Sequence, residues 1–442
     1  MKTMRIGLAG FGTVGSAVYR QIRANAGLLR ERCGILPLIC AIAVRKRRQT
    51  RRHGARLPAT LLVADVRELA DRPDLDLVIE VMGGCGDARR LLLAALRARK
   101  PVVTANKALL AEHGRELFGE MHRRQTPIFF EASVAGGIPL IQALRDSLVA
   151  NRCHLIYGIV NGTCNYILSR MSEEGVAFDV ALAQAQRLGY AEPDPSLDID
   201  GVDAAHKATI LASVANGGCV EFANVHVEGI REVTSEDVRF AHQLGYEIKL
   251  LAIIRSPGAS RVEVRVHPTL IPKANQLASV RGVTNSIMVR GHVVGDIGFS
   301  GPGAGGNATA SAVLGDVAQA ARYLANRMAR PRRDGAAPPL PCIEAHGPRV
   351  ISIDRVVSRY YLRLSVTDRP GVMAQVSSVL GRSAIGISSI IQPEGHEGRV
   401  VPLIFMIHDA PWDAMRRALR RIHHLPCVKA RPVMFRVETF ES

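Results

Sequence analysis

The sequence is poor in aromatic side chains and in lysine. Aromatic residues make up 5% of the 442 residues, there is one tryptophan, and only 8 of the 57 basic residues are lysines. A net charge of +17 and a pI near 10.0 are common in nucleic-acid-binding proteins. Here, however, the arginines are scattered over expected helix surfaces and no aromatic residues interleave with them. We therefore expect no nucleic-acid partner, and each lysine becomes informative.

Paired cysteines and long apolar runs are also missing. The cysteines form no CxxC pair and no metal-like spacing, which favours a reduced, cytoplasmic protein; they are Cys33, Cys40, Cys85, Cys153, Cys164, Cys219, Cys342 and Cys427. No apolar run approaches the roughly 20 residues that cross a bilayer. The first residues are expected to form a strand and a turn and not a signal peptide. We expect a soluble protein with no membrane partner.

The length of the chain exceeds what one ordinary hydrophobic core holds, so two to four domains are expected. The first part alternates apolar strand-like runs with helical segments. This predicts an α/β fold with a doubly wound parallel sheet of the Rossmann type over residues 1–140. Ligands of such sheets bind beyond the carboxyl ends of the strands.

A glycine-rich turn follows the first expected strand and opens a helix. The strand–GxGxxG–helix context is typical of dinucleotide binding, because the glycines permit a tight turn and close approach of the pyrophosphate to the helix N-terminus. A tight turn without a ligand is the alternative. The candidate cofactor-binding residues are Gly10, Phe11, Gly12, Thr13, Val14 and Gly15.

Arg45 and Lys46 stand where the second expected strand ends. Many dinucleotide folds place an acidic residue there, to hold the ribose 2′-hydroxyl of NAD. A cationic pair suits a 2′-phosphate instead, so the sequence favours NADP over NAD. The alternative is a solvated basic loop.

Two further candidates follow later strands of this sheet. Thr104 ends the strand expected at 101–104 and Lys107 lies just beyond it, which predicts a cofactor or catalytic contact at the crevice. The alternative is that Lys107 only caps a surface loop. Glu131 opens a glycine-rich turn whose carbonyls, with its carboxylate, form an oxygen-only donor set suited to a hard cation. A plain loop with Glu131 solvated remains open as an alternative.

The stretch 189–207 places several acidic residues in a turn-rich loop that leads into an apolar helix. Asp203 and Lys207 are four residues apart and share one face of that helix. Because the helix is apolar nearly all round, it is expected to be buried, and buried charges are paired or functional. The alternative is a solvated salt bridge.

The residues from Ala185 to Lys207 read A-x-x-x-G-Y-A-E-P-D-P-x-x-D-I-x-G-x-D-x-x-x-K, which resembles the signature of homoserine dehydrogenase. The same family is suggested by the pair 106–107, by the Asn-Gly-Thr turn at 161–163 and by the glycine loop at 301–306. Cys164 departs from the threonine expected in many relatives. The resemblance extends from Gly10 to about residue 330.

The resemblance implies NAD(P)-dependent interconversion of L-aspartate 4-semialdehyde and L-homoserine. Lys207 would be the general acid/base and Lys107 would help to polarise the reacting oxygen. Glu192 and Asp203 would hold the substrate's amino group, with Asp198 in support. Further residues implied by the family pattern are Gly189 and Gly303 beside the cofactor, and a sodium site formed by Glu131 with the backbones of Val134, Gly136 and Ile138.

Residues 141–306 contain several β-like runs and are expected to form a catalytic and dimerisation domain, giving a homodimer or homotetramer by family resemblance. A helix at about 307–330 should return to the cofactor domain. Residues 331–349 are rich in proline, glycine and arginine and predict a linker. The βαββαβ order at 350–442 resembles an ACT domain, with Asp368 and Gly371 nearest a threonine effector; a dimerisation module without ligand is the alternative.

Two other functions remain open on the sequence. One is a semialdehyde dehydrogenase that uses Cys164 as a thiol nucleophile, although no activating histidine is evident near it. The other is a basic, non-enzymatic regulator that binds nucleic acid through residues 45–52 and senses amino acids with its C-terminal part.

Overall fold

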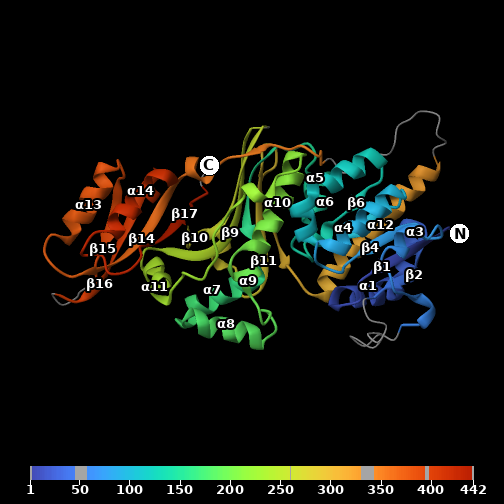
Figure 1. Cartoon of the computed structure of the whole chain (residues 1–442), viewed down its shortest axis with the longest axis horizontal. Coiled ribbons are helices and arrows are strands. Elements are labelled where there is room, and N and C mark those ends of the chain that lie inside the picture. The colour runs from blue at the N-terminus through green and yellow to red at the C-terminus, as the bar shows by residue number, and fades with distance from the viewer. Residues whose placement is uncertain (1, 45–56, 259, 330–342, 394–397, 441–442) are drawn as a thin grey trace.

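The computed structural model describes residues 2–44, 57–258, 260–329, 343–393 and 398–440. The molecule is elongated (Figure 1). The N-terminal α/β region lies at one end, a region built on a mixed sheet lies in the middle, and a smaller C-terminal module lies at the other end.

The N-terminal region is a six-stranded parallel sheet in the order β3-β2-β1-β4-β5-β6. This order is typical of dinucleotide-binding doubly wound folds and puts the crevice between β1 and β4. Its strands are largely buried, as expected for a sheet covered on both faces. They are β1 (Lys2–Ala9), β2 (Ile35–Ala43), β3 (Leu62–Val63), β4 (Leu77–Glu80), β5 (Val102–Thr104) and β6 (Ile128–Phe129).

Helices from both ends of the sequence pack on this sheet. The early helices are α1 (Thr13–Ala24), α2 (Ala26–Cys33), α3 (Glu68–Asp71), α4 (Gly86–Arg97), α5 (Lys107–Arg124) and α6 (Leu140–Gln142). The long helix α12 (Gly306–Ala329) packs along α1, and its Val313 and Val317 share one core with Ile6 and Val18. After the middle region the chain therefore returns to the N-terminal sheet.

The middle region combines a mixed sheet with helices, of which α10 lies between the sheet and the N-terminal region while α7 and α8 lie below the sheet in the view of Figure 1. Helix α10 packs on β9, β10 and α5, so it joins the two regions. The elements are β7 (Cys153–Ile159), α7 (Gly162–Glu174), α8 (Phe178–Arg187), α9 (Ser196–Ile199), α10 (Val202–Asn216), β8 (His226–Val227), α11 (Ser235–Gln243), β9 (Tyr246–Gly258), β10 (Arg261–Pro272), β11 (Thr284–Gly291) and β12 (Gly295–Pro302).

The C-terminal module has the predicted βαββαβ order and an antiparallel sheet ordered β17-β14-β16-β15. Two helices and four strands form it: β14 (Val357–Thr367), α13 (Val372–Arg382), β15 (Ile387–Ile391), β16 (Val400–Pro411), α14 (Trp412–His423) and β17 (Val433–Val437). Before it, β13 (Arg349–Val350) pairs with β10, so this part of the predicted linker is packed on the middle sheet.

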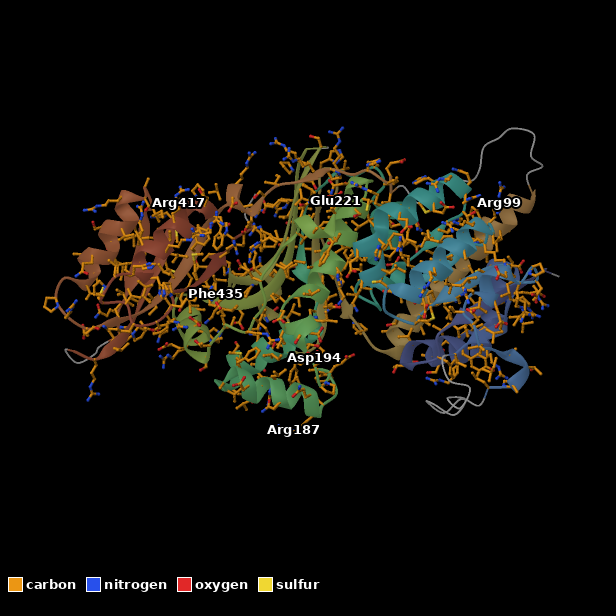
Figure 2. The ribbon with its side chains drawn as sticks, in the orientation of Figure 1. Arg99, Arg187, Asp194, Glu221, Arg417 and Phe435 are labelled. Carbon is orange, nitrogen blue, oxygen red and sulfur yellow. The ribbon has the colours of Figure 1, made fainter. Side chains whose placement is uncertain are left out.

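The module's sheet continues the middle sheet, because β17 pairs in parallel with β10 at Thr269–Arg436. Buried ion pairs reinforce the junction. Asp237 of α11 is fully buried and accepts from Arg363 at 2.6 Å. Phe435 of β17 lies beside this junction (Figure 2), and its ring stacks on that of Tyr361 of β14 with centroids 6.0 Å apart. One sheet therefore runs from the middle region into the C-terminal module.

No helix in the described ranges is long and apolar enough to cross a membrane.

Candidate active site

The turn between β1 and α1 has the geometry that the glycine motif predicts. Gly10 has φ +99°, and a Cβ atom there would lie 2.8 Å from the carbonyl oxygen of Val81. A side chain at Gly15 would collide with the carbonyl oxygen of Gly10, so only glycine allows helix and strand to approach so closely. A Cβ at Gly12 would meet open space, which leaves that backbone accessible to a phosphate.

The other residues of this motif have different surroundings. Phe11 is 5% exposed and packs edge to face on Tyr19, so its side chain belongs to the core and only its backbone faces the turn. Thr13 is exposed, and its carbonyl accepts from the hydroxyl of Ser16. Val14 lines the cavity described below. Arg45 and Lys46 lie outside the described residues.

A hydrogen-bonded group holds the ends of β4 and β5 together. Glu80 is fully buried, and burial raises the pKa of its carboxyl group. Thr104 donates to it at 2.6 Å, and Asn106 donates to the carbonyl of Gly84 at 2.7 Å. The Thr104 hydroxyl is thus directed into the protein, and its contribution is to hold the loop that carries Gly84. Glu80 belongs to no sequence motif, so its role was not predicted from the sequence.

Asp203 lies between the two predicted catalytic lysines. Its Oδ2 accepts from Lys207 Nζ at 2.7 Å, and its Oδ1 lies 3.0 Å from Lys107 Nζ. Lys207 also donates to the carbonyl of Val160 at 2.7 Å. The side chains of Lys207 and Asp203 are each 10% exposed, whereas that of Lys107 is 40% exposed. The pair on α10 is therefore buried, and the lysine from α5 completes it across the boundary between two regions.

The charges in this cluster shift one another's pKa values. Burial alone would raise the pKa of Asp203, but the two ammonium groups outweigh it and lower that pKa. Asp203 in turn raises the pKa of Lys107. These two shifts favour the ionised forms of Asp203 and Lys107, the partners of the 3.0 Å ion pair.

Asn161 organises the two carboxylates of the acidic stretch. Its Nδ2 donates to Asp198 and to Asp203, each at 2.8 Å, while its Oδ1 caps α7 by accepting from the amide of Cys164. Burial and the nearby Asp203 raise the pKa of Asp198. The Asn-Gly-Thr motif includes Asn161, but the role of Asn161 depends on contacts with residues about 40 positions away.

Cys164 is unsuited to the nucleophile role of the alternative function. Its thiol is fully buried and donates to the carbonyl of Asp198 at 3.1 Å. Burial raises the pKa of this thiol well above its ordinary value. Because the thiolate is the reactive form, the structure argues against a covalent mechanism through Cys164.

A cavity of about 510 Å³ lies against the lysine cluster. The N-terminal region contributes the loop 81–84 and α5, and the middle region contributes the acidic stretch and α10. Among its lining residues are Val14, Gly83, Gly84, Lys107, Glu192, Asp198, Asp203 and His206. Asp194, also in the lining, projects from the loop between α8 and α9 (Figure 2). The cavity therefore collects Lys107 and the three predicted substrate-binding carboxylates, of which Glu192 is exposed. Lys207 is not among the lining residues and is connected to the cavity through its hydrogen bond to Asp203.

The two other glycines predicted beside the cofactor are not among these lining residues. Gly189 has φ +74° in the exposed turn after α8, where only glycine adopts this conformation without strain. Gly303 lies so close to the side chain of Asn285 that any Cβ would collide with it. Its backbone also approaches Gly136, so the 301–306 loop packs on the turn that follows Glu131.

Glu131 is buried, and both of its carboxylate oxygens accept backbone amides. Oε1 accepts from Ile141 at 2.9 Å and Oε2 from Gln142 at 2.7 Å. The amide of Glu131 donates to Asp316 of α12 at 2.9 Å. Burial raises the pKa of Glu131, and burial with the adjacent Glu131 raises that of Asp316 well above its usual range.

The turn after Glu131 carries the other residues of the predicted sodium site. Val134, Gly136 and Ile138 lie in the turn, as the pattern requires, and the carbonyl of Ile138 accepts from the amide of Leu140. Two buried carboxylates lie together here with Arg145 as the neighbouring cation. This acid-rich oxygen donor set fits a hard monovalent cation.

Asp368 and Gly371 line a cavity of about 410 Å³ in the C-terminal module. Gly371 has φ +87° and precedes α13, and Asp368 accepts from the side-chain amide of Gln392 at 3.0 Å. The predicted regulatory pair thus lines a cavity beside the start of α13, and Figure 1 shows α13 far from α5 and α10, which carry the two lysines.

Comparison with known proteins identifies the family. The family model described as homoserine dehydrogenase matches residues 139–318, and the model for the NAD-binding domain of homoserine dehydrogenase matches residues 10–131. The chain is 41% identical over 439 residues to the homoserine dehydrogenase of Pseudomonas aeruginosa, covering 99% of both chains. It is 39% identical over 445 residues to that of Neisseria gonorrhoeae, covering 100% of both.

Two solved structures of homoserine dehydrogenases also superpose on this chain. A homoserine dehydrogenase from Thiobacillus denitrificans superposes with a TM-score of 0.91 at 40% identity, covering 99% of each chain. A hyperthermophilic archaeal homoserine dehydrogenase in complex with NADPH has a TM-score of 0.61 at 29% identity, covering 74% of this chain and 99% of that one. With the doubly wound sheet and the mixed catalytic sheet described above, the chain belongs to the homoserine dehydrogenases, NAD(P)-dependent oxidoreductases that act on a CH–OH group.

Proposed function

We propose that the chain interconverts L-homoserine and L-aspartate 4-semialdehyde with Lys207 as the general acid/base. The observation that carries this assignment is the Lys207–Asp203–Lys107 cluster, in which Lys107 and Asp203 line a cavity shared by the N-terminal and middle regions and Lys207 donates to Asp203. The nicotinamide cofactor supplies or accepts the hydride at the substrate carbon.

Lys207 donates a proton to the carbonyl oxygen when the semialdehyde is reduced and takes it back when homoserine is oxidised. Two of its three N–H donors are used on Asp203 and Val160, which leaves the third for the substrate oxygen. The ammonium stabilises the negative charge that develops on that oxygen. Lys107, half exposed on the other side of Asp203, adds a second positive charge and connects the buried proton site to solvent.

The substrate's ammonium group fits the acidic side of the cavity. Both oxygens of Asp203 already contact lysines, so its main role is to hold them in place. Glu192 and Asp198 line the same cavity and are the carboxylates available to an ammonium group. Asp198, held by Asn161, would then be neutralised by substrate in a site where it is otherwise partly desolvated.

For the cofactor, we infer a preference for NADP. Arg45 and Lys46 follow β2, whose end lies beside the first glycine turn, and two cations suit a ribose 2′-phosphate. Gly189 and Gly303 would bring further backbone close to the dinucleotide. The ratio of kcat/KM for NADP and NAD measures this preference, and R45S/K46S should shift it toward NAD.

We infer that a sodium ion is held by Glu131 with the carbonyls of Val134, Gly136 and Ile138. Its role is to order the turn on which the 301–306 loop packs and not to take part in the chemistry. Sodium chloride should therefore raise the thermal midpoint more than tetramethylammonium chloride at equal ionic strength. The difference should vanish in Glu131→Gln; an equal effect of both salts on the natural chain would contradict the site.

The C-terminal module is proposed to be an ACT domain that binds threonine at Asp368 and Gly371. Its sheet joins β10, and α10 with Lys207 packs on β10, which gives a structural connection to the active site. Threonine should lower turnover of the natural chain, and Asp368→Ala should remove that inhibition while leaving uninhibited turnover intact. Inhibition that survives in Asp368→Ala would place the effector elsewhere.

The chain is further proposed to assemble as a homodimer or homotetramer through its middle region, as family resemblance suggests. Light scattering coupled to size exclusion measures this directly.

The reaction itself is tested by following reduced nicotinamide as L-homoserine is added with NADP or NAD. Oxidation of homoserine, with little turnover of L-serine, supports the proposal. Absence of oxidation together with salt-sensitive DNA binding would instead favour the basic regulator.

A further inference from the structure

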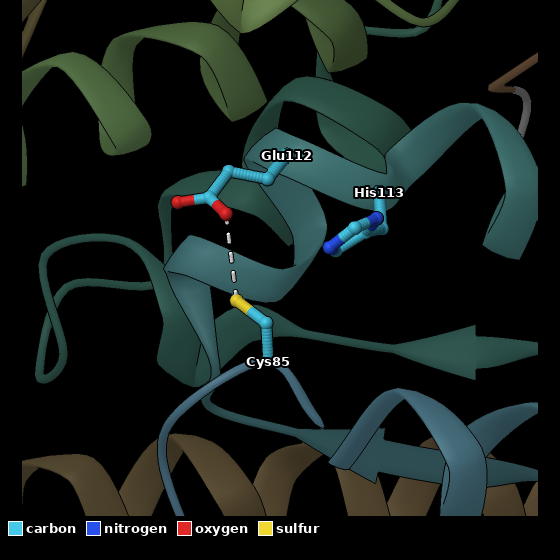
Figure 3. A group of neighbouring side chains, drawn as sticks. All are labelled: Cys85, Glu112 and His113. Carbon is cyan, nitrogen blue, oxygen red and sulfur yellow. Dashed lines mark hydrogen bonds between the residues drawn. The ribbon is translucent and has the colours of Figure 1, made fainter. Parts of the chain in front are cut away.

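Three metal-binding side chains meet where α4 begins beside α5. Cys85 is the residue that precedes α4, and Glu112 and His113 are neighbours on α5. Their ligand atoms all lie within 4.8 Å of one another, and in the described part of the chain this is the one such group of three or more. The Cys85 thiol donates to Glu112 Oε2 at 3.6 Å (Figure 3). The cysteine and the α5 pair are 27 residues apart, so no sequence spacing revealed the cluster.

The backbone of α5 leaves helical geometry at His113, where φ is −121° and ψ is 16°. Consecutive helical residues point about 100° apart, so the side chains of neighbours ordinarily diverge. The break at His113 allows it and Glu112 to turn toward the same cysteine (Figure 3).

A fourth candidate ligand faces the same carboxylate from α10. His206 Nε2 lies 3.3 Å from Glu112 Oε1. His206 is only 5% exposed, and this nitrogen makes no hydrogen bond within the described ranges. A buried imidazole nitrogen without a hydrogen bond ordinarily needs a partner. His206 also lines the active-site cavity and precedes Lys207.

We propose that Cys85, Glu112 and His113 form a binding site for a thiophilic divalent ion of the zinc class beside the active-site cavity. Thiolate, carboxylate and imidazole are the ligands that zinc prefers, whereas the sulfur excludes magnesium and calcium. One thiolate and one carboxylate neutralise the ion's two charges. His206 is outside this group of three, so water completes four-fold coordination.

The distances allow such a site with small side-chain movements. Metal–ligand bonds of about 2.0–2.3 Å place tetrahedral ligands roughly 3.3–3.8 Å apart, so the atoms must close by about one ångström. Binding releases the thiol proton to solvent and replaces the Cys85–Glu112 hydrogen bond by two metal bonds. The ion would then tie the loop after β4, which carries Gly83 and Gly84, to α5.

The test uses the full-length chain, stripped of metal and kept in a phosphine reductant, with Co²⁺ as the spectroscopic probe. One equivalent per chain should produce the thiolate-to-cobalt charge-transfer band, and Zn²⁺ should displace it. Cys85→Ser should abolish the band, and His113→Ala should weaken Co²⁺ binding by at least about ten-fold. Cys33→Ser, at the far end of α2, is the matched control and should behave like the natural chain.

The charge-transfer band does not depend on catalysis, so it tests the metal site separately from the proposed reaction. Serine is a favoured residue at a helix N-terminus, so Cys85→Ser should fold, which circular dichroism checks. Zn²⁺ should also raise the thermal midpoint of the natural chain and not that of Cys85→Ser. The proposal is overturned if the natural chain gives no charge-transfer band, or if Cys85→Ser and His113→Ala retain the band and its affinity.

Discussion

Three lysines of this protein lie in two kinds of environment. Lys207 and Lys107 both contact Asp203, which lines a cavity. Lys249, near the start of β9, is fully buried and donates only to neutral acceptors, the carbonyl of Val280 at 2.6 Å and Asn165 Oδ1 at 3.3 Å. The two environments shift the pKa of a lysine in opposite directions. Asp203 raises the pKa of Lys107, whereas burial lowers the pKa of Lys249 to about 8.

The difference shows that a rare, buried lysine is not in itself a mark of function. Lys249 is not among the lining residues of this cavity, and among the described residues its ammonium has no carboxylate within hydrogen-bonding distance. What distinguishes Lys207 and Lys107 is that they share a carboxylate, and that this carboxylate lines a cavity at the boundary of two regions. Substitutions at these positions should therefore separate activity from stability.

Asp203→Asn should have the largest effect. It leaves the buried ammonium of Lys207 without its anionic partner, and breaking a buried pair in this way costs about 3–5 kcal/mol. The positions of both lysines are also lost, so we expect homoserine turnover to fall by about 10²–10⁴-fold. Urea unfolding and steady-state kinetics measure the two effects. Near-normal turnover in a folded variant would show that Asp203 does not hold the acid/base.

Lys107→Met should lower turnover with little loss of stability. Its side chain is 40% exposed, so the ion pair contributes little to folding, but a charged hydrogen bond near the reacting oxygen is worth about 1.5–3 kcal/mol, or roughly 10–100-fold in rate. The unfolding midpoint in urea should change only slightly. A large loss of stability with unchanged kcat would reverse the roles assigned to Lys107 and Lys249.

Lys249→Met, the same substitution at the other site, should alter the pH dependence of stability and not activity. The folded pKa of about 8 lies below the unfolded value of about 10.4. Between them the unfolded chain binds more protons, so the free energy of unfolding should rise with pH, on the order of 2 kcal/mol between pH 7 and pH 9.5. This rise should be absent in the variant. If the free energy of unfolding changed equally with pH in the natural chain and in Lys249→Met, the lowered pKa of Lys249 would be contradicted.

Much of the N-terminal fold could be predicted because its signals are local. The alternation of strands and helices indicated the parallel sheet, and the glycine motif indicated the turn in which Gly10 adopts positive φ. The Asp203–Lys207 pair was also predictable, since helical spacing alone puts the two side chains on one face.

The unpredicted features depend on long-range contacts. Asn161 binds two carboxylates of the stretch that follows α8, and Glu80 supports the loop beside α5. The junction of β10 with β17 requires a strand pairing across more than 160 residues. Cys85 meets His113 only after α4 and α5 pack together. No periodicity or motif reports such contacts.

The most direct test of the central assignment compares the natural chain with Lys207→Ala in the oxidation of L-homoserine, following reduced nicotinamide, with Lys249→Ala as the matched control. Both variants should bind the cofactor. The account predicts that Lys207→Ala loses about 10²–10⁴-fold in kcat while Lys249→Ala retains it. Near-normal kcat in a folded Lys207→Ala enzyme would contradict the assignment of the acid/base.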